Sequence, residues 1–322
     1  MKLVWIALAM WMALAMATAK ALAAYPDRPI KVVMPFPPGG TVDVVTRLVC
    51  NEASELLGKP LVLDYRPGAA GIIASEAVAR APADGYTVLV TTPNHTINPA
   101  LRQKMPFNTV ADFVPVSLIG NVPELLIAHP SAPFDTLDAM VKYAKGNPGK
   151  LSYSSAGIGT LPHITMELLL RQSGVQVTHV AYKGAAPALT DLLAGVVQLK
   201  YDTYATTSPL LPSGKVKVLA TAGRARLPQL PNVATVAESG FPGYEGYLWI
   251  GVLAPRGTPA EAVSILSSSL AKAVRSPKVA ARFQADGIEA PAGGPDELGS
   301  LIARELALWA RVVREAKITV SD

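Results

Sequence analysis

The alternation of short apolar strands with amphipathic helices constrains this chain more than any other feature of its sequence. From Ile30 onward, β-rich apolar runs are separated by segments whose apolar residues recur at helical spacing. Such alternation favours βαβ units, so we expect an α/β fold whose sheets are mainly parallel. The predicted strands cover residues 30–35, 61–65, 87–91, 151–154, 177–181, 197–201 and 217–221. The predicted helices cover residues 41–57, 71–81, 137–146, 162–173, 187–194 and 295–317.

Two segments break this alternation and are typical of connections between lobes. Residues 114–129 contain two strand-like runs interrupted near Pro123, and residues 240–258 place an aromatic apolar run between flanks rich in glycine and proline. A chain of 322 residues is long enough for about two domains. A cleft between two lobes is a preferred place for a small-molecule site. The predicted lobes are a discontinuous lobe 1 of residues 24–123 plus 250–322 and a lobe 2 of residues 124–249.

The first residues have the pattern of a secretory signal. Lys2 precedes an apolar run at residues 3–17, and small residues follow and end in Ala-Leu-Ala at 21–23. This order predicts a signal peptide, residues 1–23, that directs the protein out of the cytoplasm. The apolar run is shorter than the roughly 20 residues of a spanning helix; an uncleaved membrane anchor is the alternative.

Charge and cysteine content argue against several other classes. The formal charge of +5 falls to +3 once Lys2 and Lys20 are removed with the signal, and no run of Lys or Arg follows. We therefore expect no nucleic-acid partner. The single cysteine, Cys50, cannot form an internal disulfide, so we expect a small buried side chain at this position.

A first glycine-rich turn, residues 36–43 (FPPGGTVD), links the first predicted strand to the first long helix. Gly39 and Gly40 expose backbone N–H groups, and Thr41 can cap the helix. The start of a helix carries a partial positive charge and suits an anion. A purely structural loop is the alternative.

A second such turn, residues 154–163 (SSAGIGTLPH), again joins a strand to a helix. It offers donors at Ser155, Gly157, Gly159 and Thr160. Pro162 occupies the third glycine position of a dinucleotide-binding fingerprint, so this motif is not one. Neither turn contains Lys or Arg, and an anion shared by both would be held by backbone dipoles and hydroxyl groups.

Four polar side chains near these turns are candidates with two possible roles each. Asp43 either faces the site or caps its helix. Asp202 follows a predicted strand, where ligands of α/β sheets bind, or it forms a turn. Lys200 lies on the same side of that strand and either pairs with Asp202 or reaches the cleft. His163 lies one helical turn after the second glycine turn and either faces the cleft or is structural.

Common enzyme signatures are missing from the sequence, which contains no GxSxG, HExxH or CxxC motif. The four histidines are not at paired ligand spacing, so we expect no metal site and no cofactor. A secreted hydrolase that uses Ser155 or Thr160 with His163 is an alternative, but it lacks a third member. The effector-sensing part of a regulator is another alternative that would need a DNA-binding or signalling segment.

Nine motifs occur in order along residues 25–319. They are YPDRPI at 25–30, PGGTVD at 38–43, RPGAAG at 66–71, ADGYTVLV at 83–90, DFVPVSLIG at 112–120, SAGIGTLPH at 155–163, AYKGAAPALTDLLAG at 181–195, LPNVATVAESGFPGYE at 230–245 and LAPRGTP at 253–259. Together these motifs resemble the Bug (Bordetella uptake gene), or tripartite tricarboxylate transporter receptor, family of periplasmic solute-binding proteins.

The resemblance implies a two-lobed binding protein of the Venus-flytrap type, type II-like, located in the periplasm. Such a protein captures a small organic carboxylate in the cleft, without chemical conversion, and delivers it to a membrane permease of the tripartite tricarboxylate transporter type. We expect a monomer without enzymatic activity. The ligand-binding residues implied are Phe36, Gly40, Thr41, Asp43, Asn94, Ser155, Gly157, Gly159, Thr160, His163, Tyr182, Gly184 and Asp202.

Three departures from the family pattern leave the ligand open. Lys200 stands where an apolar residue is common, Pro162 interrupts the residues before His163, and residues 196–198 read Val-Val-Gln where Gln-Val-Asp is frequent. A second carboxylate on the ligand becomes plausible if Lys200 reaches the cleft. Citrate, dicarboxylates, amino acids, nicotinate and aromatic acids all remain candidates.

Overall fold

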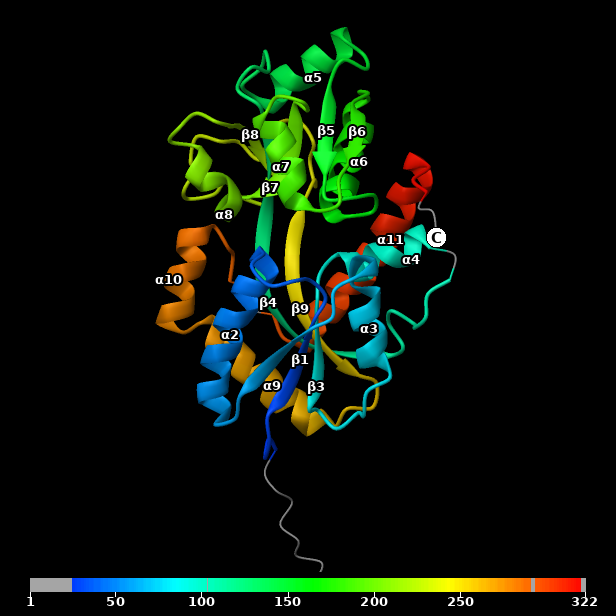
Figure 1. The fold of residues 1–322 in the computed structure, drawn as a ribbon, viewed down its shortest axis with the longest axis vertical. Coiled ribbons are helices and arrows are strands. Elements are labelled where there is room, and N and C mark those ends of the chain that lie inside the picture. The colour runs from blue at the N-terminus through cyan, green and yellow to red at the C-terminus, as the bar shows by residue number, and fades with distance from the viewer. Residues whose placement is uncertain (1–24, 103, 291–292, 320–322) are drawn as a thin grey trace, which may run out of the picture.

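Two lobes, each containing β-strands flanked by helices, are joined by two long strands (Figure 1). The computed structural model describes residues 25–102, 104–290 and 293–319, so the predicted signal peptide lies outside the described residues. Among the described residues, no helix is long and apolar enough to cross a membrane.

The sheet of lobe 1 combines parallel and antiparallel strands. Strand β1 (Ile30–Met34) lies between β2 (Leu61–Tyr65) and β3 (Thr87–Thr91), and both neighbours run parallel to it. Strand β9 (Tyr247–Pro255) is antiparallel to β3 and to β4 (Phe113–Ala128). Each predicted strand in this lobe is present, within one residue of its predicted end.

Lobe 2 has a similar mixed sheet. Strand β5 (Ser152–Ser155) lies parallel to both β6 (Thr178–Ala181) and β7 (Leu199–Thr203). The far part of β4 is antiparallel to β7 and to β8 (Lys217–Thr221). The α/β fold class is confirmed, but the expectation of mainly parallel sheets needs correction, because β4 and β9 cross between the lobes in opposite directions.

The predicted interruption of the first connection near Pro123 is wrong. Strand β4 continues through this residue, and Pro123 lies opposite Tyr247 of β9. The Glu124 N–H donates to the carbonyl oxygen of Gly246, on the side of β9. The Asn121 N–H donates to the carbonyl oxygen of Glu289, on the opposite side of the strand. By the alternation of a strand, the nitrogen of Pro123 faces away from β9, so its missing N–H costs no bond to that strand. The predicted lobe boundaries thus fall inside β4 and β9.

Helices flank the sheets, and several match the predicted ranges. They are α2 (Thr41–Leu57), α3 (Ile72–Ala79), α4 (Asn94–Leu101), α5 (Leu137–Gly146), α6 (Leu161–Ser173), α7 (Ala185–Leu193), α8 (Tyr204–Thr207), α9 (Ala260–Val274), α10 (Pro277–Asp286) and α11 (Pro295–Ala316), with 3₁₀ turns at Ala69–Gly71 and Ser208–Leu210. Helices α4, α8, α9 and α10 have no counterpart among the predicted ranges. Helix α4 is short and contains Pro99, α8 has four residues, and α10 buries only Val279 and Phe283, which is too little for a helical pattern.

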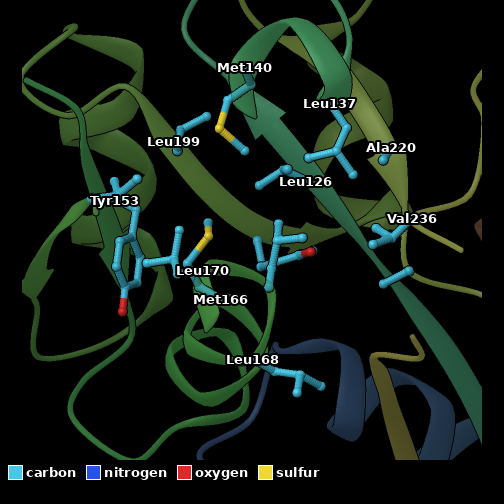
Figure 2. Close-up of a cluster of buried hydrophobic side chains, with 14 of the residues drawn as sticks. Leu126, Leu137, Met140, Tyr153, Met166, Leu168, Leu170, Leu199, Ala220 and Val236 are labelled. Carbon is cyan, nitrogen blue, oxygen red and sulfur yellow. The ribbon is translucent and has the colours of Figure 1, made fainter. Parts of the chain in front are cut away.

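Each lobe has its own apolar core. Figure 2 shows the lobe 2 cluster, which contains Met140 of α5, Met166 of α6, Leu126 of β4 and Leu199 of β7. A second cluster in lobe 1 includes Cys50, which is 2% exposed as expected. Burial raises the pKa of its thiol to about 12, so this cysteine is inert at neutral pH.

Candidate ligand-binding site

The strand directions place the carboxyl ends of two strand sets opposite each other. Strands β1, β2 and β3 run in the same direction as β4, which leads toward lobe 2. Strand β7 is antiparallel to β4, and β5 and β6 run with β7, so these three lead back toward lobe 1. In Figure 1 the N-terminal end of α2 accordingly points at the upper lobe, whose β5 arrow points down. Ligands of α/β sheets bind beyond such strand ends.

The first glycine turn leaves backbone N–H groups free at this edge. Gly39 has a φ of 98°, which glycine adopts readily, and Gly40 is the extended N-cap residue of α2. Within the described part of the chain, no acceptor bonds the N–H groups of Thr41, Val42 or Asp43. A Cβ atom on Gly40 would meet nothing within 4 Å. The space before these donors is therefore open to an anion.

The Asp43 carboxylate holds this turn from inside. It is 5% exposed and accepts hydrogen bonds from the Gly39 N–H at 2.9 Å, the Tyr65 hydroxyl at 2.5 Å and the Arg47 guanidinium at 3.1 Å. Burial alone would raise its pKa, but these hydrogen bonds and the Arg47 charge outweigh burial and lower the pKa. Both oxygens are thus occupied by partners inside lobe 1, although neither accepts from an N–H group of α2 itself. Sequence reasoning missed Arg47 and Tyr65.

The second glycine turn uses its own donors internally. The Gly157 N–H donates to Ser155 Oγ at 3.2 Å, and the hydroxyls of Ser155 and Thr160 donate to Gly157 O at 3.1 and 2.7 Å. The Gly159 N–H donates to His163 Nδ1 at 3.0 Å. The loop around Gly157 is therefore closed by hydrogen bonds, and neither glycine N–H is free, contrary to the prediction from the sequence. The N–H groups of Ala156, Ile158 and Leu161 have no acceptor among the described residues.

Two histidines stack beneath the second turn. The rings of His163 and His179 are 3.9 Å apart and nearly parallel. Burial and the neighbouring His179 lower the pKa of His163 to about 3, and burial lowers the pKa of His179 to about 4. Both imidazoles are thus neutral at pH 7. Sequence reasoning missed His179, which enters the site because β6 pairs with β5 in parallel register and sets His179 opposite Tyr153.

The hydrolase alternative fails on this geometry. Ser155 is fully buried, and its hydroxyl lies 2.7 Å from Nε2 of His179, not His163. The Thr160 hydroxyl donates to a backbone carbonyl. Neither hydroxyl is therefore bonded to His163, which the hydrolase alternative requires as its base.

Tyr182 and Gly184 lie at the end of the neighbouring strand β6. The Tyr182 N–H donates to Ser155 O at 3.1 Å, which ties this strand end to the second turn. The Tyr182 hydroxyl donates to Asp191 at 2.5 Å, and this bond, together with burial, raises its pKa to about 12. Gly184 is the N-cap residue of α7 with a φ of 134°, a conformation that suits glycine.

Lys200 and Asp202 form a buried ion pair at the end of β7. Lys200 Nζ lies 2.7 Å from Asp202 Oδ2 and 2.9 Å from the carbonyl oxygen of Tyr201. The second carboxylate oxygen of Asp202 accepts the Thr203 N–H at 2.8 Å. Lys200 is 1% exposed, so of the two predicted roles the structure shows the pairing with Asp202.

A third buried charge-bearing group, Glu124, lies near this pair and was not predicted. Its side chain is 2% exposed, and Oε2 has no partner among the described residues. Burial raises its pKa to about 8, partly offset by Thr165 and by the charge of Lys200. Glu124 is therefore mostly protonated at neutral pH, so the charges of Lys200 and Asp202 cancel locally.

The two remaining predicted residues lie in lobe 1. Phe36 follows β1, is half-buried and packs against the lobe 1 core. Asn94 begins α4 after β3 and is 8% exposed. The predicted set thus divides by lobe. Phe36, Gly40, Thr41, Asp43 and Asn94 follow strands of lobe 1, and Ser155, Gly157, Gly159, Thr160, His163, Tyr182, Gly184 and Asp202 lie at strand ends of lobe 2.

A pocket of about 360 Å³ lies elsewhere, between α6, α11 and the crossing strands, and contains none of the predicted residues. Three arginines line it, but Arg224 is paired with Glu245 at 2.9 Å, and the lining also includes Glu289, Glu297 and Glu305. Because its four glutamates outnumber its three arginines, this pocket is a poor place for a carboxylate.

Known proteins with related sequences and structures resemble this chain over most of its length. The model of the family described as "tripartite tricarboxylate transporter family receptor" matches residues 45–318. Protein BugT of Bordetella pertussis is 35% identical over 293 residues, 90% of each chain. An R. palustris protein solved with adipate is 37% identical with a TM-score of 0.83, and the match covers 92% of this chain and 99% of that one.

A second solved structure, MatC from Rhodopseudomonas palustris with bound malate, is 34% identical with a TM-score of 0.79. The match covers 90% of this chain and all of the other. The family match, the sequence relatives and the shared fold agree with one another. The chain belongs to the tripartite tricarboxylate transporter receptor family, the Bug family of solute-binding proteins.

Proposed function

We propose that this protein is a periplasmic receptor that captures a small organic carboxylate between its lobes and delivers it to a tripartite tricarboxylate-type permease. One observation carries the proposal: the N–H groups at the start of α2 have no acceptor among the described residues and lie at the edge of lobe 1 toward which the strands of lobe 2 lead. A carboxylate placed there satisfies these donors and the helix dipole, which contributes of order 0.3–1 kcal/mol. The signal peptide at residues 1–23 provides export.

Ligand capture would involve closure of one lobe on the other. The predicted lobes are residues 24–123 plus 250–322 and residues 124–249. Both connections are continuous strands, so small changes along β4 and β9 can close one lobe on the other as a hinge. On closure, the second turn and the ends of β6 and β7 cover the ligand held at Gly40 and Thr41. The closed loop around Gly157 then acts as a rigid wall, with the neutral His163 beneath it.

Two relatives narrow the ligand class. The R. palustris relative was solved with adipate and MatC with malate, and both ligands are dicarboxylates. We infer that a small dicarboxylate is the ligand class of this chain too. We also propose that the protein acts as a monomer and converts no substrate. The hydroxyls of Ser155 and Thr160, which are bonded inside the second turn, support the absence of conversion.

Thermal-shift measurements followed by isothermal titration calorimetry test this function. The panel is adipate, malate, citrate, hexanoate and nicotinate with the mature protein. We expect a dicarboxylate to raise the melting temperature and to bind with a Kd near micromolar, about −8 kcal/mol. If no carboxylate in the panel raises the melting temperature, the proposal is overturned.

A further inference from the structure

The buried pair of Lys200 and Asp202 lies beside the second glycine turn. Strands β5 and β7 are parallel, and Lys200 lies opposite Ser154. Asp202 is two residues nearer the carboxyl end of β7, at the level where β5 gives way to the turn at Ser155 to Gly159. Asp202 therefore lies at the edge of lobe 2 that faces lobe 1.

An unpaired carboxylate at this edge would oppose the capture of an anion. Coulomb repulsion between like charges a few ångströms apart is substantial at a partly buried site. Lys200 removes this obstacle, because its ammonium group contacts Asp202 Oδ2 at 2.7 Å, and the side chains are 2% and 8% exposed. Glu124, the other acid near Lys200, adds little charge because burial keeps it mostly protonated at neutral pH.

We propose that Lys200 is a specificity-determining residue of this receptor. By pairing with Asp202, it cancels the negative charge of that carboxylate in the lobe 2 wall of the site, so a ligand with two carboxylates is accepted. The inference rests on the proposed function, since it concerns the charge of the same ligand. Lys200 acts through Asp202 and does not touch the ligand.

A series of charge variants tests the inference with two six-carbon ligands, adipate, which has two carboxylates, and hexanoate, which has one. The variants are Lys200→Met (net change −1), Asp202→Asn (+1) and the double variant (0). The measured quantity is the ratio of the hexanoate Kd to the adipate Kd. An added site charge acts on both carboxylates of adipate but on one of hexanoate. We expect the ratio to fall about tenfold in Lys200→Met, to rise about tenfold in Asp202→Asn, and to return to within threefold of wild type in the double variant.

The double variant also protects the test against misfolding. Each single variant leaves a buried charge unpaired, which is strongly destabilising, whereas removal of both charges is often tolerated. Circular dichroism and thermal melting establish which variants are folded, and any folded single variant compared with the double variant shows the sign of the charge effect. A merely structural ion pair would alter stability without changing the ratio.

The outcomes separate this inference from the proposed function. If wild-type protein binds no carboxylate, the proposed function and this inference both fail. If it binds adipate but the ratio is the same in all folded variants, or shifts in the same direction in both single variants, the role of Lys200 is refuted and the receptor function stands.

Discussion

The two glycine turns share one hydrogen-bond arrangement and differ in which backbone N–H groups they leave without an acceptor among the described residues. In each, the side chain four residues after a glycine accepts that glycine's N–H: Asp43 from Gly39 at 2.9 Å, and His163 from Gly159 at 3.0 Å. The first turn leaves the next N–H groups without acceptors among the described residues, whereas the second also closes on itself through Ser155. The first is therefore prepared to bind an anion, and the second is prepared to form a rigid wall.

The chemical nature of the accepting side chain differs as well. Asp43 carries a negative charge that Arg47 balances, so the first turn is held by an ionic cluster inside lobe 1. His163 is neutral and stacks on His179. Similar strand-to-helix turns can thus divide the work of one site.

The largest effect is expected from Gly40→Asp in the first turn. Asp is a favoured N-cap residue, Gly40 has an extended conformation, and a Cβ there meets nothing within 4 Å, so the fold should tolerate the change. The new carboxylate takes the free N–H groups and repels the ligand by about 4 kcal/mol at 4 Å, so calorimetry should show about a thousandfold loss of affinity for adipate.

A matched control is Gly294→Asp, the same change at the uncapped N-cap of α11. It should leave adipate affinity unchanged, because α11 begins away from the predicted ligand residues. Equal losses in both variants, or retained binding in Gly40→Asp, would show that the start of α2 does not hold the ligand.

Next in size is His163→Ala in the second turn. This change removes a buried ring, 4% exposed, and leaves the Gly159 N–H without its acceptor. Lost packing and an unsatisfied donor should together cost about 3 kcal/mol in urea unfolding. His163→Asn, whose side-chain oxygen can accept the same N–H, should recover part of this loss. If both variants are as stable as wild type, His163 does not hold the turn.

Acid titration should separate the turns by the pH at which each loses stability. The pKa values of His163 and His179 are lowered from 6.5 to about 3 and about 4 in the folded protein. At these two positions the unfolded chain binds more protons than the native one below pH 6.5, so the contribution of the two histidines to stability falls as pH falls from 6.5 toward 4. Between pH 6.5 and 5, His163 alone can account for about 2 kcal/mol.

Asp43 should behave differently in the same titration. Its folded pKa lies below the ordinary value of 3.8, so its contribution is present above that pH and is lost only as pH falls through the folded pKa. Urea unfolding at several pH values measures both windows. The double variant His163→Asn with His179→Gln should reduce the slope between pH 6.5 and 5, leaving the part due to buried His95, whose pKa is lowered to about 4; an unchanged slope would remove His163 and His179 as its cause.

The smallest effect is expected from Ser155→Ala. The hydroxyl bonds Gly157 twice and lies 2.7 Å from His179, but it is fully buried and presents nothing to the ligand. Loss of these bonds should cost about 1 kcal/mol of stability. Adipate affinity should change less than threefold. A hundredfold loss of affinity would instead place the Ser155 hydroxyl in direct contact with the ligand.

The site could be predicted in part, because its turns are local features. Gly39 and Gly40 stand between a strand pattern and a helix pattern, and the structure has these elements within a residue of their predicted ends. The partners of these turns were beyond prediction. Tyr65 reaches Asp43 from the end of β2, and His179 reaches Ser155 from β6, both through strand pairing between distant segments.

The sequence by itself determined the α/β class, the positions of most strands and helices, and the two turns, because these depend on side-chain periodicity and on glycine within short windows. Only the tertiary structure decided which N–H groups stay free and whether Lys200 pairs with Asp202 or faces the cleft. Those outcomes depend on burial and strand register. Register sets residues far apart in the chain opposite one another, and burial determines whether a charge must find a partner inside the protein.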